Sequence, residues 1–302
     1  MLKTSFLLVA GLAGVQTMSA NVESSPPAAE YTHQIETWRT QRVERLKAPG
    51  GWLSLIGLPW LKDGRNTIGS DKGNDVVLAK GPAHLGTIVL KDGKATIELD
   101  AKADATIDGR RAKSAELLDD SHDKPTTVAF GSASFYLIDR NGRKGLRVKD
   151  TEAKTRKEFL GIDYFPIDPS WRVEATWVPY QPAHTLEIPT VLGTVDKMPV
   201  PGKAVFERDG KRYELLPVIE EPGAKELWFI FADRTSAKET YGGGRFLYAD
   251  MPKDGKLVID FNKAYNPPCA FTPYATCPMA PPENRLGLPV TAGEKKYRGG
   301  HH

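Results

Sequence analysis

Asp-Gly and Asn-Gly pairs recur along most of this chain, and they constrain its fold more than any other feature. They stand at Asp63-Gly64, Asp92-Gly93, Asp108-Gly109, Asn141-Gly142, Asp209-Gly210 and Asp254-Gly255. Such pairs favour two-residue β-hairpin turns, because both central residues of that turn need positive φ angles. Segments with strand character flank them, for example residues 87–90 and 95–99 around Asp92-Gly93. Strands at this spacing predict a sandwich or barrel, so we expect a mainly β protein.

Composition agrees with a turn-rich globular chain. The 302 residues include 28 glycines and 23 prolines, which favours many turns and few long helices. The 41 basic and 38 acidic side chains leave a formal charge of only +3. This balance predicts neither a nucleic-acid partner nor an anionic membrane surface. The length favours two domains, and the oligomeric state is left open.

The first twenty residues are predicted to be a cleavable signal peptide. Lys3 precedes an apolar run over residues 6–15 that is too short to span a membrane, and the small residues Ser19 and Ala20 follow. An uncleaved anchor or a buried helix is the alternative. Residues 21–30 are rich in Ser, Pro and Ala and read as a linker. We therefore expect an exported protein, periplasmic or secreted, without membrane attachment after cleavage.

The mature chain divides by pattern into a helix and two β-rich parts. Ile35, Trp38, Val43 and Leu46 recur at helical spacing before Pro49-Gly50-Gly51, which predicts an amphipathic helix. The expected segments are a helix over 31–51, a β-sandwich over 52–154, an aromatic connector over 155–183, a barrel-like β domain over 184–297 and a tail over 298–302. The connector's aromatic side chains suit either packing between domains or a sugar site.

The second β-rich part is expected to end in an ordered loop. Its predicted strands cover residues 185–188, 204–208, 213–218, 227–232, 245–249 and 257–261. Prolines then recur from Pro267 to Pro289. Proline lacks the backbone N–H that helices and central strands need, so this segment should lie across the barrel as a loop.

Motifs within residues 67–109 resemble the forkhead-associated pattern. They are Thr67-Ile68-Gly69-Ser70, Asn74-Asp75-Val76-Val77-Leu78, His84-Leu85-Gly86-Thr87-Ile88 and Ile107-Asp108-Gly109. The resemblance implies a forkhead-associated-like sandwich for residues 52–154. In that family an Arg after the first Gly holds a phosphate, whereas this chain has Ser70. A neutral hydroxyl cannot make the bidentate, charge-assisted contact, so the resemblance does not extend to phosphopeptide binding.

Longer motifs in the second half resemble an uncharacterised bacterial family, the domain of unknown function 1684. They are Asp233 with Thr240-Tyr241-Gly242-Gly243-Gly244-Arg245-Phe246-Leu247, Asp260-Phe261-Asn262-Lys263-Ala264-Tyr265-Asn266-Pro267-Pro268-Cys269-Ala270-Phe271, Cys277-Pro278-Met279-Ala280-Pro281-Pro282-Glu283-Asn284-Arg285-Leu286, and Ala292-Gly293-Glu294. The resemblance covers residues 35–297. It implies membership of that family and no particular activity.

The chain contains two cysteines, Cys269 and Cys277, within the Pro-rich segment. An even count in an exported protein favours a disulfide. A catalytic cysteine acting with His184 is the alternative. A zinc site would need two further ligands, and no internal histidine lies near the cysteines in sequence, so no metal is predicted. Nothing in the sequence predicts a cofactor.

The turn Gly242-Gly243-Gly244-Arg245 is the main candidate for a binding site. It is no nucleotide loop, because no Lys-Ser/Thr follows and a strand comes next. Three glycines would let the backbone approach a ligand, and Arg245 would offer its fork of donors to a carboxylate or phosphate. Predicted companions are Tyr241, Asn262, Asn266 and Asn284, with Glu283 as a general acid or base. Alternatively, Arg245 pairs with Asp233 or Asp260, and the polar side chains stabilise the irregular loop.

These observations favour a protein that binds a small anionic molecule at Arg245 and the Pro-rich loop. A hydrolase or another acid-base enzyme using the same pocket is one alternative. A structural or interaction protein of the cell envelope is the other, and it predicts Arg245 in a closed ion pair. Motifs of common hydrolases, metalloproteases and dinucleotide enzymes are absent from the sequence.

Overall fold

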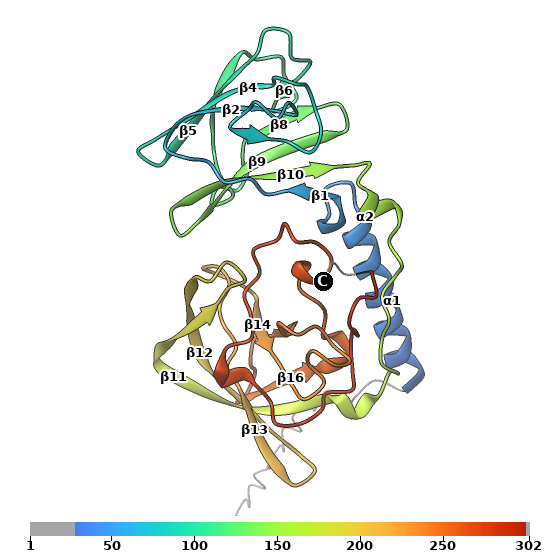
Figure 1. Cartoon of the computed structure of the whole chain (residues 1–302). Helices are drawn as coiled ribbons and strands as arrows, with labels where there is room; N and C mark the ends of the chain where they lie inside the picture. The colour runs from blue at the N-terminus through green and yellow to red at the C-terminus, as the bar shows by residue number, and fades with distance from the viewer. Residues whose placement is uncertain (1–27, 300–302) are drawn as a thin grey trace, which may run out of the picture.

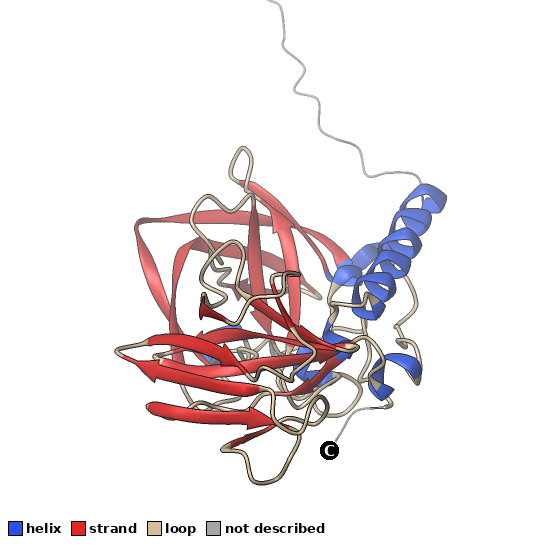
Figure 2. Ribbon diagram, turned by 90° about the horizontal axis from the view of Figure 1, so that it is seen from above, coloured by secondary structure: helices blue, strands red, loops and turns tan. Residues whose placement is uncertain are grey.

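The computed structural model describes residues 28–299, which form two β-rich parts flanked by a long helix (Figure 1). Helix α1 spans Ala28–Lys47 and begins inside the predicted linker. Figure 2 shows the helices gathered on one side of the strands. The predicted signal peptide, residues 21–27 of the linker and residues 300–302 of the tail lie outside the described residues. Between residues 28 and 299, no helix has the length and apolar character needed to cross a membrane.

The N-terminal part is a sandwich of two five-stranded sheets. Their strand orders are β1-β10-β9-β8-β6 and β3-β2-β4-β5-β7. The strands are β1 (Leu55–Gly57), β2 (Gly64–Gly69), β3 (Val76–Val77), β4 (Gly86–Lys91), β5 (Lys94–Leu99), β6 (Thr106–Ile107), β7 (Ser114–Leu117), β8 (Thr127–Phe130), β9 (Ala133–Arg140) and β10 (Arg143–Asp150). Side chains from both sheets share one core, including Ile88 and Ile97 from one and Phe135 and Leu146 from the other.

The Asp-Gly and Asn-Gly pairs make the predicted turns at five of their six positions. At Asp92-Gly93, for example, the φ angles are 50° and 75°, as a two-residue hairpin turn of type I′ requires. Asp63-Gly64 differs, because Gly64 alone has a positive φ and begins strand β2. Strand β2 pairs with β3 and β4 and not with the segment before it. The mainly β expectation is therefore confirmed.

The C-terminal part is a half-barrel closed by irregular chain. Strands β11 (Arg172–Pro189), β12 (Val195–Arg208), β13 (Lys211–Leu215) and β16 (Lys256–Asp260) form a sheet of order β13-β12-β11-β16. Strands β14 (Glu226–Phe231) and β15 (Arg245–Asp250) form a separate ribbon. Phe229, Phe231, Leu247 and Phe261 fill the core between them. Strand β11 starts within the segment expected to be a connector.

Short helical turns and loops make up the remainder of the described chain. They include η1 (Trp52–Ser54), α2 (Lys154–Lys157), η2 (Pro169–Trp171), η3 (Phe261–Lys263), η4 (Pro268–Ala270) and η5 (Pro282–Asn284). The Pro-rich segment contains no named strand and is an ordered loop, as its prolines predict.

The aromatic residues of segment 155–183 pack against the C-terminal part. Phe159 stacks on Tyr297 with ring centroids 5.5 Å apart. Trp171 is 4% exposed and meets Phe261 edge-on at 5.7 Å. Of the two interpretations of this segment, the structure therefore favours packing over an exposed sugar-binding surface.

Helix α1 is fixed to the C-terminal part by buried polar contacts. Near its start, the Tyr31 hydroxyl donates to Asp260 Oδ1 at 2.8 Å and accepts from Asn262 Nδ2 at 2.8 Å. Further along, Arg42 Nε donates to Glu294 Oε1 at 3.0 Å. These contacts hold one face of α1 against the C-terminal part.

One prediction concerns acid stability of the N-terminal sandwich. Asp119, whose side chain is 10% exposed, accepts hydrogen bonds from Lys144 and Ser121. Burial opposes its charge, yet these hydrogen bonds outweigh burial and hold the pKa of Asp119 well below its usual range. A depressed pKa stabilises the fold above the unfolded-state pKa of about 4, and the benefit is lost as pH falls through the folded pKa.

We therefore expect Asp119→Asn to lower the free energy of unfolding at pH 7, with the difference from wild type shrinking as the pH falls below about 4. Urea unfolding at several pH values measures this difference. Asp104→Asn is the control, because the Asp104 side chain is 99% exposed. A difference between Asp119→Asn and wild type that is the same at pH 7 and pH 3 contradicts the assignment.

Candidate functional site

A cavity of about 560 Å³ lies where α1, the N-terminal sandwich and the Pro-rich loop meet. We call it the interdomain cleft. Its charged lining consists of Arg42 and Arg45 from α1, Arg140 and Arg147 from β9 and β10, and Glu220. Its aromatic lining is Trp38, Trp52, Trp228, Phe246, Tyr248 and Tyr265, and its loop residues are Pro268, Thr276, Cys277 and Pro278. Four cations and one carboxylate around aromatic walls favour a ligand that carries negative charge.

Arg147 is a buried cation of this lining whose hydrogen-bond donors are only partly satisfied. It is 4% exposed, and its Nη1 and Nη2 donate to Tyr136 and Thr276 at 3.3 Å each, which is long for such bonds. Its Nε is buried and has no partner among residues 28–299. The nearest carboxylate oxygen, Oδ2 of Asp120, lies 3.9 Å away and is held by Arg140 at 2.7 Å. The Arg147 guanidinium therefore keeps donors and charge for another group.

The other arginines of the cleft differ in how many of their N–H groups have a hydrogen-bond partner. Arg140 makes bonds of 3.1 and 2.7 Å to the two carboxylate oxygens of Asp120. Arg42 pairs with Glu294 at 3.0 Å, and its Nη2 donates to the Asn266 carbonyl at 2.8 Å. Within the described part of the chain, Arg42 Nη1 and the exposed Arg45 side chain have no hydrogen-bond partner.

A second hollow of about 360 Å³ adjoins the cleft and shares Arg42, Arg45 and Arg147 with it. Lys149 also lines this hollow and donates to the Gly50 carbonyl at 2.7 Å. Burial, together with the charge of Arg147, lowers the pKa of Lys149. The charge of Arg147 beside Lys149 makes this hollow positive, and an anion bound there would stabilise both cations.

Glu220 forms the acidic part of the cleft. Its Oε2 accepts a hydrogen bond from the Tyr248 hydroxyl at 2.6 Å. Burial, the neighbouring Tyr265 and Glu220 raise the pKa of Tyr248, so this hydroxyl keeps its proton at neutral pH. The pair is a fixed donor and acceptor beside the arginines.

The structure places Arg245 in a closed network away from this lining. The residue is 1% exposed, and its Nη2 donates to Asp233 Oδ2 and to the Val290 carbonyl at 2.9 Å each. Its Nη1 donates to the carbonyls of Ala292 and Glu294. Burial lowers the pKa of Arg245, and the Asp233 charge opposes that shift. Arg245 thus forms the closed ion pair that was expected for a structural or interaction protein, and it holds residues 290–294 in place.

The predicted asparagines also bond to backbone groups. Asn262 accepts from the Asp168 N–H at 3.0 Å and donates to its carbonyl at 2.9 Å. Asn284 does the same with Leu216, at 2.8 and 2.9 Å. Asn266 Nδ2 donates to the Lys295 carbonyl at 2.7 Å, while its Oδ1 is buried without a partner among residues 28–299. All three asparagines are buried and stabilise loop backbone.

Glu283 and Tyr241, the last two predicted site residues, make no hydrogen bond with the Arg245 side chain. Glu283 is exposed and has no side-chain hydrogen bond or ion pair within the part of the chain that the structure describes. Tyr241 is half-buried, and burial raises its pKa. It lines a separate cavity of about 320 Å³ with Cys269 and Tyr274. Of the two segments predicted to form the binding site, the glycine-rich turn and the Pro-rich loop, the Pro-rich loop lines the interdomain cleft.

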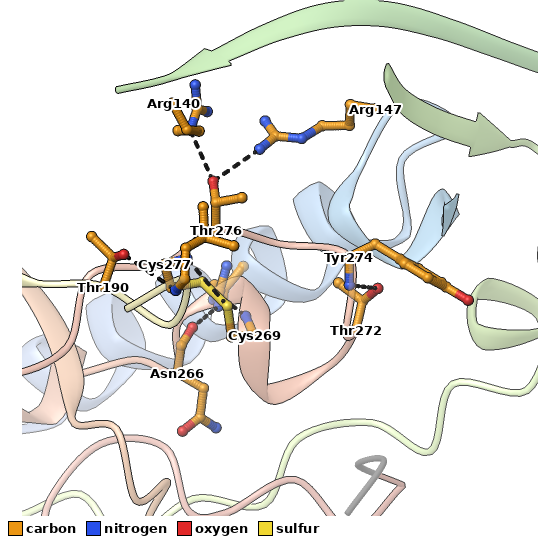
Figure 3. The surroundings of a disulfide bond; sticks show 11 residues. Arg140, Arg147, Thr190, Asn266, Cys269, Thr272, Tyr274, Thr276 and Cys277 are labelled. Carbon is orange, nitrogen blue, oxygen red and sulfur yellow. Dashed lines mark hydrogen bonds between the residues drawn. A yellow bond between two sulfur atoms is a disulfide. The ribbon is translucent and has the colours of Figure 1, made fainter. Parts of the chain in front are cut away.

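The predicted disulfide is present and supports that loop. Cys269 and Cys277 are bonded, with their Cα atoms 6.1 Å apart. Thr276, next to Cys277, accepts hydrogen bonds from Arg140 at 2.9 Å and from Arg147 at 3.3 Å (Figure 3). The disulfide therefore restrains the loop residue that contacts both arginines. Residues 28–299 contain no free cysteine and no cluster of three potential metal ligands.

Removal of the disulfide tests this role. We expect the free energy of unfolding of the double variant Cys269→Ser/Cys277→Ser to be about 2–3 kcal/mol lower than that of wild type. The reason is that the unfolded variant lacks the short cross-link that restricts the unfolded wild-type chain. Urea unfolding without reductant measures the difference. Reductant should destabilise the wild type to the same level and leave the double variant unchanged. Equal stability of wild type and variant would show that the loop is held by its other contacts alone.

Comparisons with known proteins place the C-terminal part in a family. Residues 157–295 match the family described as Protein of unknown function (DUF1684). An uncharacterized protein of Haloarcula marismortui, solved in solution by NMR, is 30% identical, and the match covers 46% of this chain and 78% of that chain with a TM-score of 0.40. No curated protein matches. The family match does not reach residues 52–154, so the forkhead-associated resemblance stays a prediction. Through residues 157–295, the chain belongs to the DUF1684 family.

Proposed function

We propose that this protein binds a small anionic molecule in the interdomain cleft. The state of Arg147 carries the proposal: a guanidinium that is 4% exposed, makes two long hydrogen bonds of 3.3 Å through its Nη atoms, and has its nearest carboxylate oxygen 3.9 Å away. A buried cation without full partners is costly for the fold. An oxyanion would supply short, charge-assisted bonds to it.

The proposal keeps the class of ligand predicted from the sequence and moves its site. Arg245 Nη1 and Nη2 are bonded to Asp233 and to loop carbonyls, and its Nε is buried without a partner among residues 28–299. The carboxylate nearest to Arg147 lies 3.9 Å away, and no carboxylate among those residues forms an ion pair with Arg45. The Pro-rich loop contributes Thr276 to the cleft. Glu283 is exposed and outside the cleft lining, so we assign it no acid-base role.

An exported location is part of the proposal. A disulfide persists in oxidising compartments such as the periplasm or the extracellular medium, and this chain has its two cysteines bonded to each other. A binding protein in such a compartment would meet its ligand outside the cytoplasm. Mass determination of the protein secreted from cells that express the full chain tests cleavage of the predicted signal peptide.

An NMR titration tests the proposed binding. Inorganic phosphate is added to ¹⁵N-labelled protein, with chloride at the same ionic strength as the control. We expect saturable shifts of the Arg147 Nε–Hε signal and of the Thr276 amide, because phosphate would bind beside both. Saturable shifts confined to residues 233–245, or no saturable shift, would contradict the proposal.

A further inference from the structure

Three of the aromatic residues that line the interdomain cleft form a row of nearly parallel rings. The rings of Trp228 and Tyr248 are 6.2 Å apart with an interplanar angle of 15°. The rings of Tyr248 and Tyr265 are also 6.2 Å apart, at 16°. The row ends at Arg42, whose guanidinium carbon lies 4.7 Å from the Tyr265 ring centroid. We call Trp228, Tyr248 and Tyr265 the ring row.

The strand register produces this row. Trp228 and Tyr248 are direct partners across β14 and β15, so their side chains leave the ribbon on the same face. Tyr265 joins the ribbon through an isolated bridge to Phe246, two residues before Tyr248. Phe246 is 4% exposed and meets Trp228 edge-on at 4.9 Å, which fixes the Trp228 ring. The ring row is therefore a rigid surface and not a chance meeting of mobile side chains.

The cleft thus places a cationic region next to an aromatic one. Arg42 belongs to both, because its guanidinium covers Tyr265 while its Nη1 has no partner among residues 28–299. Arg147 lies on the facing strand β10, where it lines the same cavity. Trp228 is buried and Tyr248 and Tyr265 are half-buried, so a ligand that satisfies only the arginines would leave parts of the two tyrosine rings in contact with water. Burial of those ring faces favours a ligand with an apolar, planar part.

We infer that the ligand is an aromatic anion, a planar ring bearing a carboxylate or phosphate. This inference rests on the proposed anion binding and adds the chemical class. The anionic group lies between Arg42 and Arg147, and the ring lies against the half-buried Tyr248. An offset stack on this ring fits the geometry that aromatic pairs prefer. Aliphatic polyanions would match the arginines and gain nothing from the ring row.

Isothermal titration calorimetry with three probes tests the class of ligand. The probes are 1-naphthyl phosphate, inorganic phosphate and 1-naphthol, at one ionic strength and pH. We expect 1-naphthyl phosphate to bind about tenfold or more tightly than inorganic phosphate, because stacking on aromatic side chains contributes such factors. We expect 1-naphthol to bind more weakly than 1-naphthyl phosphate.

Variants of the ring row locate the contact. Tyr248→Ala should lower the affinity for 1-naphthyl phosphate about tenfold and leave the affinity for inorganic phosphate unchanged. Tyr248→Phe keeps the ring without the bond to Glu220 and should bind 1-naphthyl phosphate as wild type does, which separates stacking from a folding defect. Tyr180→Ala is the matched control, because Tyr180 stacks on His184 and is not part of the cleft lining.

The possible results separate the two proposals. Equal affinities for the two phosphates would overturn the aromatic class and leave anion binding intact. Equal affinities for 1-naphthol and 1-naphthyl phosphate would overturn anion binding. If neither phosphate binds, both proposals fail. Tight binding of 1-naphthyl phosphate that Tyr248→Ala does not weaken would show that the ring row is not the contact.

Discussion

Replacement of Arg245 by Met is expected to lower the free energy of unfolding by about 3–5 kcal/mol. Met keeps much of the side-chain volume and removes the charge. Asp233, whose side chain is 1% exposed, would then be a buried carboxylate without its cation. The carbonyls of Val290 and Ala292 would lose their side-chain donor as well. Urea unfolding at neutral pH measures the loss.

Two further variants make the Arg245 result interpretable. Lys256→Met breaks an ion pair with Glu174 whose two side chains are 62% and 56% exposed, so it should cost less than about 1 kcal/mol. Adding Asp233→Asn to Arg245→Met should recover part of the loss, because the unpaired buried charge is then removed. An Arg245→Met protein as stable as Lys256→Met that no longer binds phosphate would restore Arg245 as the ligand-binding residue.

Replacement of Arg147 by Met is expected to weaken binding of 1-naphthyl phosphate and of inorganic phosphate by about tenfold to a hundredfold. A hydrogen bond to a charged group contributes about 1.5–3 kcal/mol, which corresponds to those factors. Arg147→Lys should give an intermediate loss, because lysine restores the charge and not the planar fork of donors. Isothermal titration of each variant measures the affinities.

Arg143→Met is the matched control for Arg147→Met. Both arginines lie on strand β10, and both variants change the net charge equally. Arg143 is exposed, and its guanidinium carbon lies 4.4 Å from the Trp60 ring centroid, outside the cleft lining. Its loss should leave phosphate affinity unchanged. Equal weakening by the two variants would mean that phosphate responds to the overall positive field and not to a defined site.

Local signals in the sequence predicted most of the fold. The hairpin at Asp92-Gly93 depends on two residues and their flanks, which the sequence displays directly. Strand β11 was harder to predict from the sequence, because Pro179 and Pro182 interrupt its strand pattern. Its first half therefore fell within the predicted connector. The structure accommodates them with a register shift between Pro179 and His184, so the strand continues past both prolines.

The candidate site was harder to predict, because its parts meet across long stretches of chain. Arg42 and Arg147 are about a hundred residues apart and come from a helix and a strand. The one local sign of Arg147 is its position between the apolar residues Leu146 and Val148, and Arg147 was not among the predicted site residues. Arg245 stands in a conspicuous glycine-rich turn, yet that turn serves to bury its guanidinium against Asp233. A pattern along the chain shows which residues are unusual, and only the packed structure shows which of them keep free donors.

Crystals soaked in selenate would locate an oxyanion most directly, because selenium gives an anomalous signal. We predict the strongest selenium peak that is not at a lattice contact in the interdomain cleft, within hydrogen-bond distance of the Arg147 guanidinium. The Arg147→Met protein, soaked in the same way, should lose that peak. A cleft without selenium in the wild-type crystal, or selenate bound at Arg245 instead, would contradict the assignment of the anion site to the interdomain cleft.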